Sequence, residues 1–186
     1  MEQGYHTPVL LEESVGLLSV DPAGTYVDLT FGGGGHSRRI LSLLGPEGRL
    51  YGFDQDRDTL ANRPDDGRFH YVESNFRFLR AALRLRGVAQ VDGILADLGV
   101  SSHHFDAVER GFSFRGTALL DMRMNRRGGR TAADVVNTYD RDALTRVLGD
   151  WGELSTPWKV AGCIERARAA APITTTDALV AAVAPC

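Results

Sequence analysis

The feature of the sequence that most constrains the fold is a run of four glycines, Gly32 to Gly35, between a strand-like and a helix-like segment. Residues 26–31 form a short, mostly apolar run typical of a buried strand, and residues 36–44 carry apolar side chains at helical spacing. Glycine lets the backbone turn sharply and lets a ligand approach without meeting a Cβ atom. The N-terminus of the following helix offers free N–H groups and a positive dipole. The pattern indicates a nucleotide or nucleoside cofactor, although a tight turn without a ligand has the same local sequence.

Strand-like and helix-like segments continue to alternate up to Gly99. Further strands are predicted at residues 49–53, 69–72 and 91–96, and a helix at residues 76–85. Strands that alternate with helices form right-handed βαβ units and a parallel sheet. The sequence therefore predicts an α/β fold with a doubly wound, Rossmann-like parallel sheet.

The second part of the chain has a different character. Residues 100–130 are rich in Ser, His, Arg and Gly and are predicted to form a long loop. Helices without strands follow, with Thr131 and Thr175 as predicted N-caps. We expect two parts, a Rossmann-like domain over residues 1–100 and a loop with a helical subdomain over residues 101–186. The predicted helices cover residues 132–137, 141–149, 157–170 and 176–184.

Composition limits the function classes. The formal net charge of −3 argues against a strongly basic protein that binds nucleic acid without specificity, but it does not exclude local RNA contacts. No apolar run approaches the roughly 20 residues that cross a bilayer, and residues 1–10 show no signal-peptide pattern. We therefore expect a cytoplasmic protein with no membrane partner. Cys163 and Cys186 show no metal-ligand spacing, and neither a disulfide nor a metal site is expected.

Two carboxylates follow predicted strands. Asp54 ends the second strand about 20 residues after the glycines, where such folds place a carboxylate on the ribose hydroxyls. Asp97 ends the fourth strand, and a second negative charge there suits a cationic sulfonium better than a diphosphate. The dinucleotide spacing G-x-G-x-x-G is met only approximately, because Ser37 stands at its third position. These residues favour S-adenosylmethionine, with an NAD(P)-dependent oxidoreductase of Rossmann type as the alternative.

Six sequence motifs occur in order along nearly the whole chain. Together they resemble the MraW (RsmH) family, bacterial enzymes that methylate N4 of a cytidine in 16S ribosomal RNA. The motifs are His6-Thr-Pro-Val-Leu-Leu11, Asp28-Leu-Thr-Phe-Gly-Gly-Gly-Gly-His-Ser37, Phe53-Asp-Gln-Asp56, Asp92-Gly-Ile-Leu-Ala-Asp-Leu-Gly-Val-Ser-Ser102, Glu109-Arg-Gly-Phe-Ser-Phe114 and Leu120-Asp-Met-Arg-Met124.

The resemblance implies a class I methyltransferase domain with a helical insertion after the fourth strand. It also implies S-adenosylmethionine as cofactor and a cytidine in the P-site region of the small ribosomal subunit as substrate. His104 stands where the family usually has Gln, and an imidazole replaces only one hydrogen bond of that amide. The residues that the resemblance assigns to the cofactor are Gly34, Gly35, His36, Asp54, Phe76, Asp97 and His104.

Family members are longer than this chain. We therefore expect a truncated sheet that lacks the last three strands, with a free edge on the fourth strand that exposes Ile94 and Leu95. An inactive fragment of the methyltransferase is accordingly a further alternative.

Catalysis and RNA binding are assigned from position along the chain. An oxygen that accepts a hydrogen bond from the cytidine amine would raise its nucleophilicity, and Asp97, Ser101 and Asp121 are the candidates. The arginines after the fourth strand are candidates for contacts to RNA phosphates, and the alternative is a solvated loop. They are Arg110, Arg123, Arg126 and Arg127.

Overall fold

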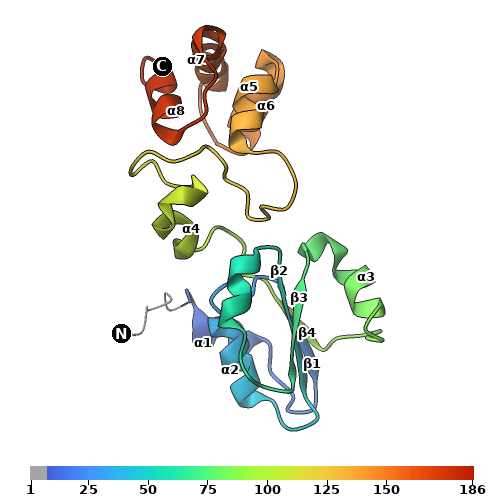
Figure 1. Cartoon of the computed structure of the whole chain (residues 1–186). Coiled ribbons are helices and arrows are strands. Elements are labelled where there is room, and N and C mark those ends of the chain that lie inside the picture. The colour runs from blue at the N-terminus through green and yellow to red at the C-terminus, as the bar shows by residue number, and fades with distance from the viewer. Residues whose placement is uncertain (1–7) are drawn as a thin grey trace. The chain divides into compact units, whose positions relative to one another are not determined.

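The computed structural model describes residues 8–186 (Figure 1). The first two residues of the motif that begins at His6 lie outside the described part of the chain. The chain divides into two compact units, one up to Val100 and one from Ser101 to Cys186.

The first unit is built on a four-stranded parallel sheet in the order β3-β2-β1-β4. This confirms the parallel α/β sheet predicted from the alternation of strands and helices. The strands are β1 (Thr25–Asp28), β2 (Arg49–Asp54), β3 (Phe69–Glu73) and β4 (Gly93–Leu95). The helices are α1 (Leu11–Leu17), α2 (Gly35–Leu43) and α3 (Leu79–Arg84), with 3-10 turns η1 (Arg57–Asn62) and η2 (Phe76–Phe78).

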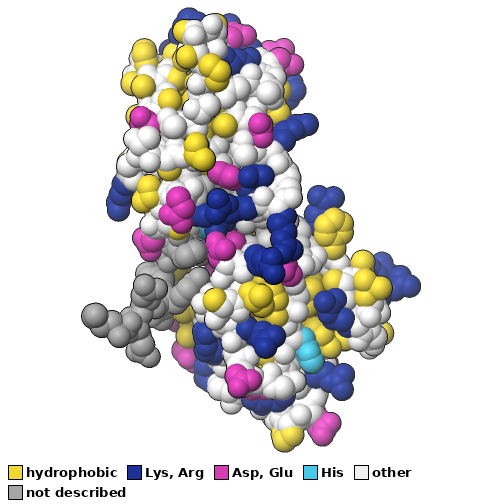
Figure 2. Space-filling view, in the orientation of Figure 1, with side chains coloured by type: hydrophobic (Ala, Val, Ile, Leu, Met, Phe, Trp, Pro, Cys, Tyr) yellow, Lys and Arg dark blue, Asp and Glu magenta, His cyan; other side chains and the backbone are white. Residues whose placement is uncertain are grey.

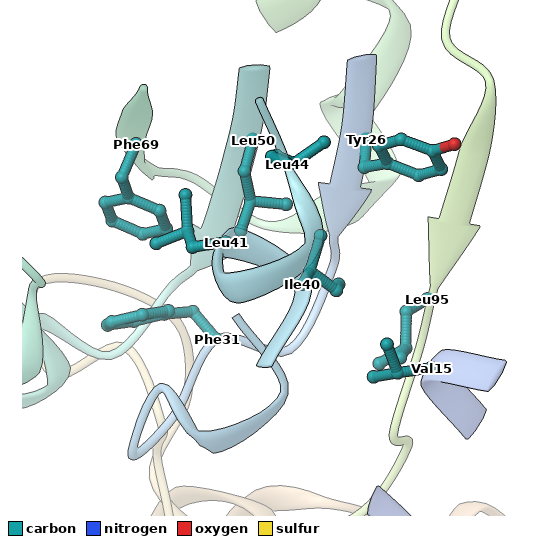
Figure 3. Close-up of a cluster of buried hydrophobic side chains, with 9 residues drawn as sticks. All are labelled: Val15, Tyr26, Phe31, Ile40, Leu41, Leu44, Leu50, Phe69 and Leu95. Carbon is teal, nitrogen blue, oxygen red and sulfur yellow. The ribbon is translucent and has the colours of Figure 1, made fainter. Parts of the chain in front are cut away.

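Both faces of the sheet are covered, which explains why its central strands are continuous apolar runs. Successive side chains of a strand point to opposite faces, so Tyr26 and Val27 belong to different core clusters. On one face, α1 and α2 contribute Val15, Ile40 and Leu41 to the cluster shown in Figure 3. On the other face, Ala82 and Leu83 of α3 pack beside Val27, Tyr51, Phe53 and Val72.

Strand β4 forms one edge of the sheet and pairs only with β1 among the described strands. The structure confirms the expected exposure of Ile94, which is 46% exposed, but Leu95 is only 7% exposed. The prediction for Leu95 was wrong because neighbouring residues of a strand face opposite sides, and Leu95 packs into the cluster that contains Val15.

The second unit is helical. Residues 100–130 were predicted as a loop, but they contain a short helix, α4 (Ser102–Asp106), and a 3-10 turn, η3 (Val108–Arg110). Thr131 caps α5 in a reciprocal capping box with Asp134, and Thr175 caps α8, as predicted. The helices that follow are α5 (Ala132–Thr138), α6 (Arg141–Asp150), α7 (Pro157–Ala170) and α8 (Thr176–Val183). The unit has its own core of Leu120, Val136, Leu144, Ala161, Ile164 and Ile173.

The structure joins Cys163 to Cys186 in a disulfide, although none was expected from the sequence. Cys163 lies in α7, and α8 packs against α7 before the chain reaches Cys186. A separation of 23 residues does not reveal this contact, because the contact depends on how two helices pack. Between residues 8 and 186, no helix has both the length and the apolar character needed to cross a membrane.

Candidate cofactor-binding site

The site of the first unit lies at the carboxyl end of β1. The sheet continues to β2 on one side of β1 and to β4 on the other, and open α/β sheets bind ligands in the crevice at such a reversal of strand order. The backbone N–H of Phe31 donates to the carbonyl of Phe53 at 2.9 Å, and that of Leu29 donates to Leu95 at 2.9 Å. These bonds hold the loop after β1 between the two neighbouring strands.

The glycine-rich turn connects β1 to α2. Gly34 is the N-cap of α2 with φ of 77°, and a Cβ atom there would lie 2.9 Å from the ring of Phe31. The turn itself therefore requires glycine at this position, whether or not a ligand binds. Gly32 also has a positive φ, of 50°, but a Cβ atom there would meet only the carbonyl of Thr30 at 3.7 Å. The open space of the turn is thus at Gly32.

Asp54 connects the end of β2 to the same turn. Its Oδ2 accepts a hydrogen bond from the N–H of Gly32 at 2.9 Å, and its Oδ1 accepts one from the N–H of Asp56 at 2.8 Å. The side chain of Asn62 donates to the carbonyl of Gly32 at 3.0 Å. Asp54 thereby holds the glycine-rich turn against the end of β2.

His36 and Asp28 are buried beneath the turn. Ser37 Oγ donates to Asp28 Oδ2 at 2.7 Å, and the N–H of Thr30 donates to Asp28 Oδ1 at 3.0 Å. Burial raises the pKa of Asp28, and the hydrogen bond from Ser37 opposes this effect. His36 is 5% exposed, and its Nε2 has no hydrogen-bond partner among the described residues. A buried polar atom without a partner is uncommon, and it makes Nε2 a candidate to pair with a ligand atom.

The sequence alone predicted no functional role for Asp28. The signal that identifies it is its position as the last residue of a buried strand directly before the glycines. Its bond to Ser37 joins the end of β1 to the first turn of α2.

Asp97 and Phe76 complete this edge of the sheet. The N–H of Asp97 donates to Thr30 Oγ1 at 2.8 Å, which places the exposed Asp97 beside the end of β1. Phe76 begins η2, just after β3, and is 42% exposed. The amide of Asn75 donates to Gln55 Oε1 at 2.7 Å and connects the loops after β3 and β2. The structure therefore brings Gly34, Gly35, His36, Asp54, Phe76 and Asp97 to one edge of one sheet.

Ser101 and His104 belong to the second unit and contact each other. The N–H of Ser101 donates to His104 Nδ1 at 3.1 Å, so Nδ1 is an acceptor and Ser101 Oγ, 3.0 Å away, donates to it as well. His104 is 7% exposed, and its ring centroid is 4.9 Å from that of Phe112.

Asp121 is held by an ion pair. Both of its oxygens accept bonds of 2.8 Å from the guanidinium of Arg123, which lowers the pKa of Asp121. The ion pair occupies acceptor positions on both oxygens, which makes Asp121 less suited than Asp97 to accept a bond from a substrate amine.

The arginines assigned to RNA differ in accessibility. Arg110 is 2% exposed and donates to the carbonyls of Arg123 at 3.0 Å and Met124 at 3.2 Å. Arg110 is therefore poorly placed for the predicted phosphate contact, because its side chain is buried and stabilises the loop that follows. Arg126 and Arg127 are exposed, and Arg123 is partly exposed.

Comparison with known proteins identifies the family of this chain. A model of the MraW methylase family matches residues 3–186. A protein of Bacteroides fragilis named Ribosomal RNA small subunit methyltransferase H is 58% identical over 174 residues, which cover 94% of this chain and 57% of the relative. The proteins of the same name from Bacteroides thetaiotaomicron and Flavobacterium johnsoniae are 58% identical over 167 residues and 54% identical over 175 residues. The aligned residues cover 90% and 94% of this chain and 55% and 58% of these two relatives.

The chain thus spans a little more than half the length of the curated relatives that it matches. The family model covers all of the strands and helices described above. The chain belongs to the MraW methylase family.

Proposed function

We propose that this chain binds S-adenosylmethionine and serves the methylation of cytidine N4 in the P-site region of 16S ribosomal RNA. The observation that carries the proposal is the arrangement at the end of β1. There a glycine-rich turn, two strand-end carboxylates and the unpartnered Nε2 of a buried histidine meet at one edge of the sheet. The printed names of the relatives support a substrate in the small ribosomal subunit.

The residues present fit the cofactor. Asp54 would accept bonds from the ribose hydroxyls, as its position at the end of β2 indicates. His36 Nε2 would gain a polar partner, and the exposed ring of Phe76 would pack against the adenine. The carboxylate of Asp97 would attract the positive sulfonium. S-Adenosylmethionine, when bound, supplies an electrophilic methyl group with a neutral leaving group.

The contribution of the protein to the reaction is mainly alignment. The cytidine must leave its stack so that N4 reaches the methyl group. Holding the reacting atoms in line before the reaction lowers the entropic part of the activation barrier. Asp97 is the preferred acceptor for a hydrogen bond from the N4 amine because its carboxylate is exposed beside the end of β1. Ser101 and Asp121 are the other candidates, but both are engaged in the bonds described above.

The partner would be 16S ribosomal RNA within the small subunit, in the cytoplasm. Arg126 and Arg127 are exposed and can contact its phosphates, together with the partly exposed Arg123. His104 would complete the cofactor set as the resemblance implies.

Calorimetry of ligand binding tests the cofactor. We expect the chain to bind S-adenosylhomocysteine and not NADH, because the third glycine of the dinucleotide pattern is missing. Asp54→Asn should weaken binding at least tenfold, since a charge-assisted bond contributes about 1.5–3 kcal/mol. Asp65→Asn, an exposed carboxylate in a loop, is the matched control. Binding of NADH, or equal affinities of both variants, would contradict the assignment.

Methyl transfer tests the substrate. Small subunits that lack the modification are incubated with radiolabelled S-adenosylmethionine, and the RNA is digested to nucleosides. The Bacteroides fragilis relative serves as the positive control. Labelled N4-methylcytidine is the expected product. If the relative yields labelled N4-methylcytidine and this chain does not, the proposal for this chain is limited to cofactor binding.

A further inference from the structure

The first unit contains a concave surface away from the cofactor site. It is a hollow of about 730 Å³ where β2 and β3 begin. Figure 2 shows many Lys and Arg side chains on the face of the molecule that it presents. The charged side chains that line the hollow are Glu47, Arg49, Arg63, Arg68 and Arg86, and His70 lines it as well. We call this surface the basic hollow.

The charge of the basic hollow is one-sided. Four arginines face it against a single glutamate, although the whole chain has a net charge of −3. Partial burial and the nearby charges of Arg49 and Arg86 lower the pKa of His70. The basic hollow is therefore locally positive, although the chain as a whole is negative.

Two of the four arginines are held by the protein itself. Arg68 forms a two-point ion pair with Asp66, with N–O distances of 2.9 and 2.6 Å, and Arg86 donates to the carbonyl of Ala82 at 2.9 Å. Arg49 and Arg63 are exposed and make no ion pair within residues 8–186. Their guanidinium groups are the ones that can bind an external anion. A guanidinium matches two oxygens of a phosphate in a bidentate geometry.

The basic hollow is distinct from the cofactor site. Arg49 is the first residue of β2, whereas Asp54 is its last. At about 3.3 Å per residue, the two positions are roughly 16 Å apart. An anion in the basic hollow would therefore lie at the opposite end of the sheet from the glycine-rich turn.

We propose that the basic hollow binds phosphates of the substrate RNA, at nucleotides some distance from the cytidine that is modified. This inference rests on the proposed function and names a second contact surface for the same RNA. A polyanion is favoured over a single small anion because the arginines come from separate segments around a hollow of about 730 Å³. His70, stacked on Tyr51 at a centroid distance of 4.9 Å, adds an aromatic surface of the kind on which unpaired bases stack.

The test compares two double variants of equal charge. Arg49→Gln/Arg63→Gln replaces the two exposed arginines of the basic hollow that make no ion pair within residues 8–186. Arg80→Gln/Arg84→Gln removes two exposed arginines of α3 that do not line it. Binding of a fluorescently labelled single-stranded RNA is measured by anisotropy over a range of salt concentrations. The first variant should bind at least tenfold more weakly at low salt. The slope of log affinity against log salt should fall by about 1.4, since each phosphate contact on a single strand contributes about 0.7.

Further variants and ligands separate the possible outcomes. Arg49→Lys/Arg63→Lys keeps the charge and should retain most of the salt slope, which excludes a folding defect as the cause. Equal losses in the two Gln variants, or unchanged binding by the first, would overturn the inference. Binding of inorganic phosphate in calorimetry without any binding of RNA would overturn it as well. The proposed function is judged separately, because S-adenosylhomocysteine binding and methylcytidine formation are measured on the same proteins.

Discussion

The side chain of His36 carries a buried polar atom without a partner, and this costs the fold free energy. It is 5% exposed at the start of α2, and its Nε2 has no partner among the described residues. Leaving a buried polar group unpaired costs about 1–3 kcal/mol. A ligand atom that pairs with Nε2 would recover this free energy only in the bound state.

His36→Leu should therefore separate stability from binding. An apolar side chain of similar size removes the unpaired nitrogen, so we expect the free energy of unfolding without ligand to stay equal or to rise by about 1 kcal/mol. The affinity for S-adenosylhomocysteine should fall at least tenfold. Denaturant unfolding and calorimetry measure the two quantities. His70→Leu, at an exposed histidine outside the cofactor site, is the control for binding. Loss of stability with unchanged affinity would show that His36 is structural.

The glycine-rich turn shows that two glycines in one segment serve different purposes. At Gly34, φ of 77° and the nearby ring of Phe31 both require glycine. At Gly32, φ is 50° but the space beside it is open. The fold thus requires glycine at position 34, whereas the space beside Gly32 is open. The carboxylate of Asp54 accepts a hydrogen bond from the N–H of Gly32.

Alanine substitutions at three glycines test this distinction. Gly34→Ala combines a left-handed backbone, which costs about 1–2 kcal/mol, with a steric conflict against Phe31, and should destabilise most. Gly32→Ala has only the backbone cost and should be intermediate. Gly67→Ala has ordinary φ and no atom within 4 Å, so it should be neutral to within about 0.5 kcal/mol. Thermal unfolding without ligand measures all three. Equal stabilities of the Gly34 and Gly67 variants would contradict the structural role of Gly34.

The sequence predicted most of the elements and missed two short helices. Strands buried on both faces produce apolar runs, so β1, β2 and β3 were found within a few residues of their observed ends. Helix α7 was predicted over the same residues that the structure shows. The short helices α1 and α4, of 7 and 5 residues, were not predicted. Helices of this length depend on tertiary packing rather than on an extended periodic pattern, and α5, also of 7 residues, was found because Thr131 marks its N-cap.

The candidate site also combines features that the sequence predicted with features that it did not. Asp54 and Asp97 were placed at one edge of the sheet because parallel strands end together. The bond between Asp28 and Ser37, the unpartnered nitrogen of His36 and the burial of Arg110 depend on side-chain packing. No spacing in the sequence reveals these contacts, and the same holds for the disulfide between Cys163 and Cys186.

At the scale of the whole molecule, the two units have separate cores. The core around Val27 and Leu50 belongs to the sheet, and the core around Leu144 and Ile164 belongs to the helices of the second unit. Of the residues proposed to bind the cofactor, only His104 lies in the second unit. Both tryptophans, Trp151 and Trp158, also lie there. Tryptophan fluorescence therefore reports on the second unit alone, whereas calorimetry reports on both.

Adding S-adenosylhomocysteine should move the unfolding of the first unit and leave the tryptophan signal in place. A ligand at one hundred times its Kd stabilises the unit that binds it by about 2.7 kcal/mol. For a domain of this size that corresponds to an upward shift of about 10 °C or more in the calorimetric transition of residues up to Val100. The fluorescence transition of Trp151 and Trp158 should shift by less than about 2 °C, since six of the seven proposed residues lie outside their unit. A parallel shift of both transitions would contradict this expectation and show that the second unit also binds the ligand. His104→Ala would then restore the difference if His104 makes that contact. A shift of the fluorescence transition alone would overturn the placement of the cofactor at the end of β1.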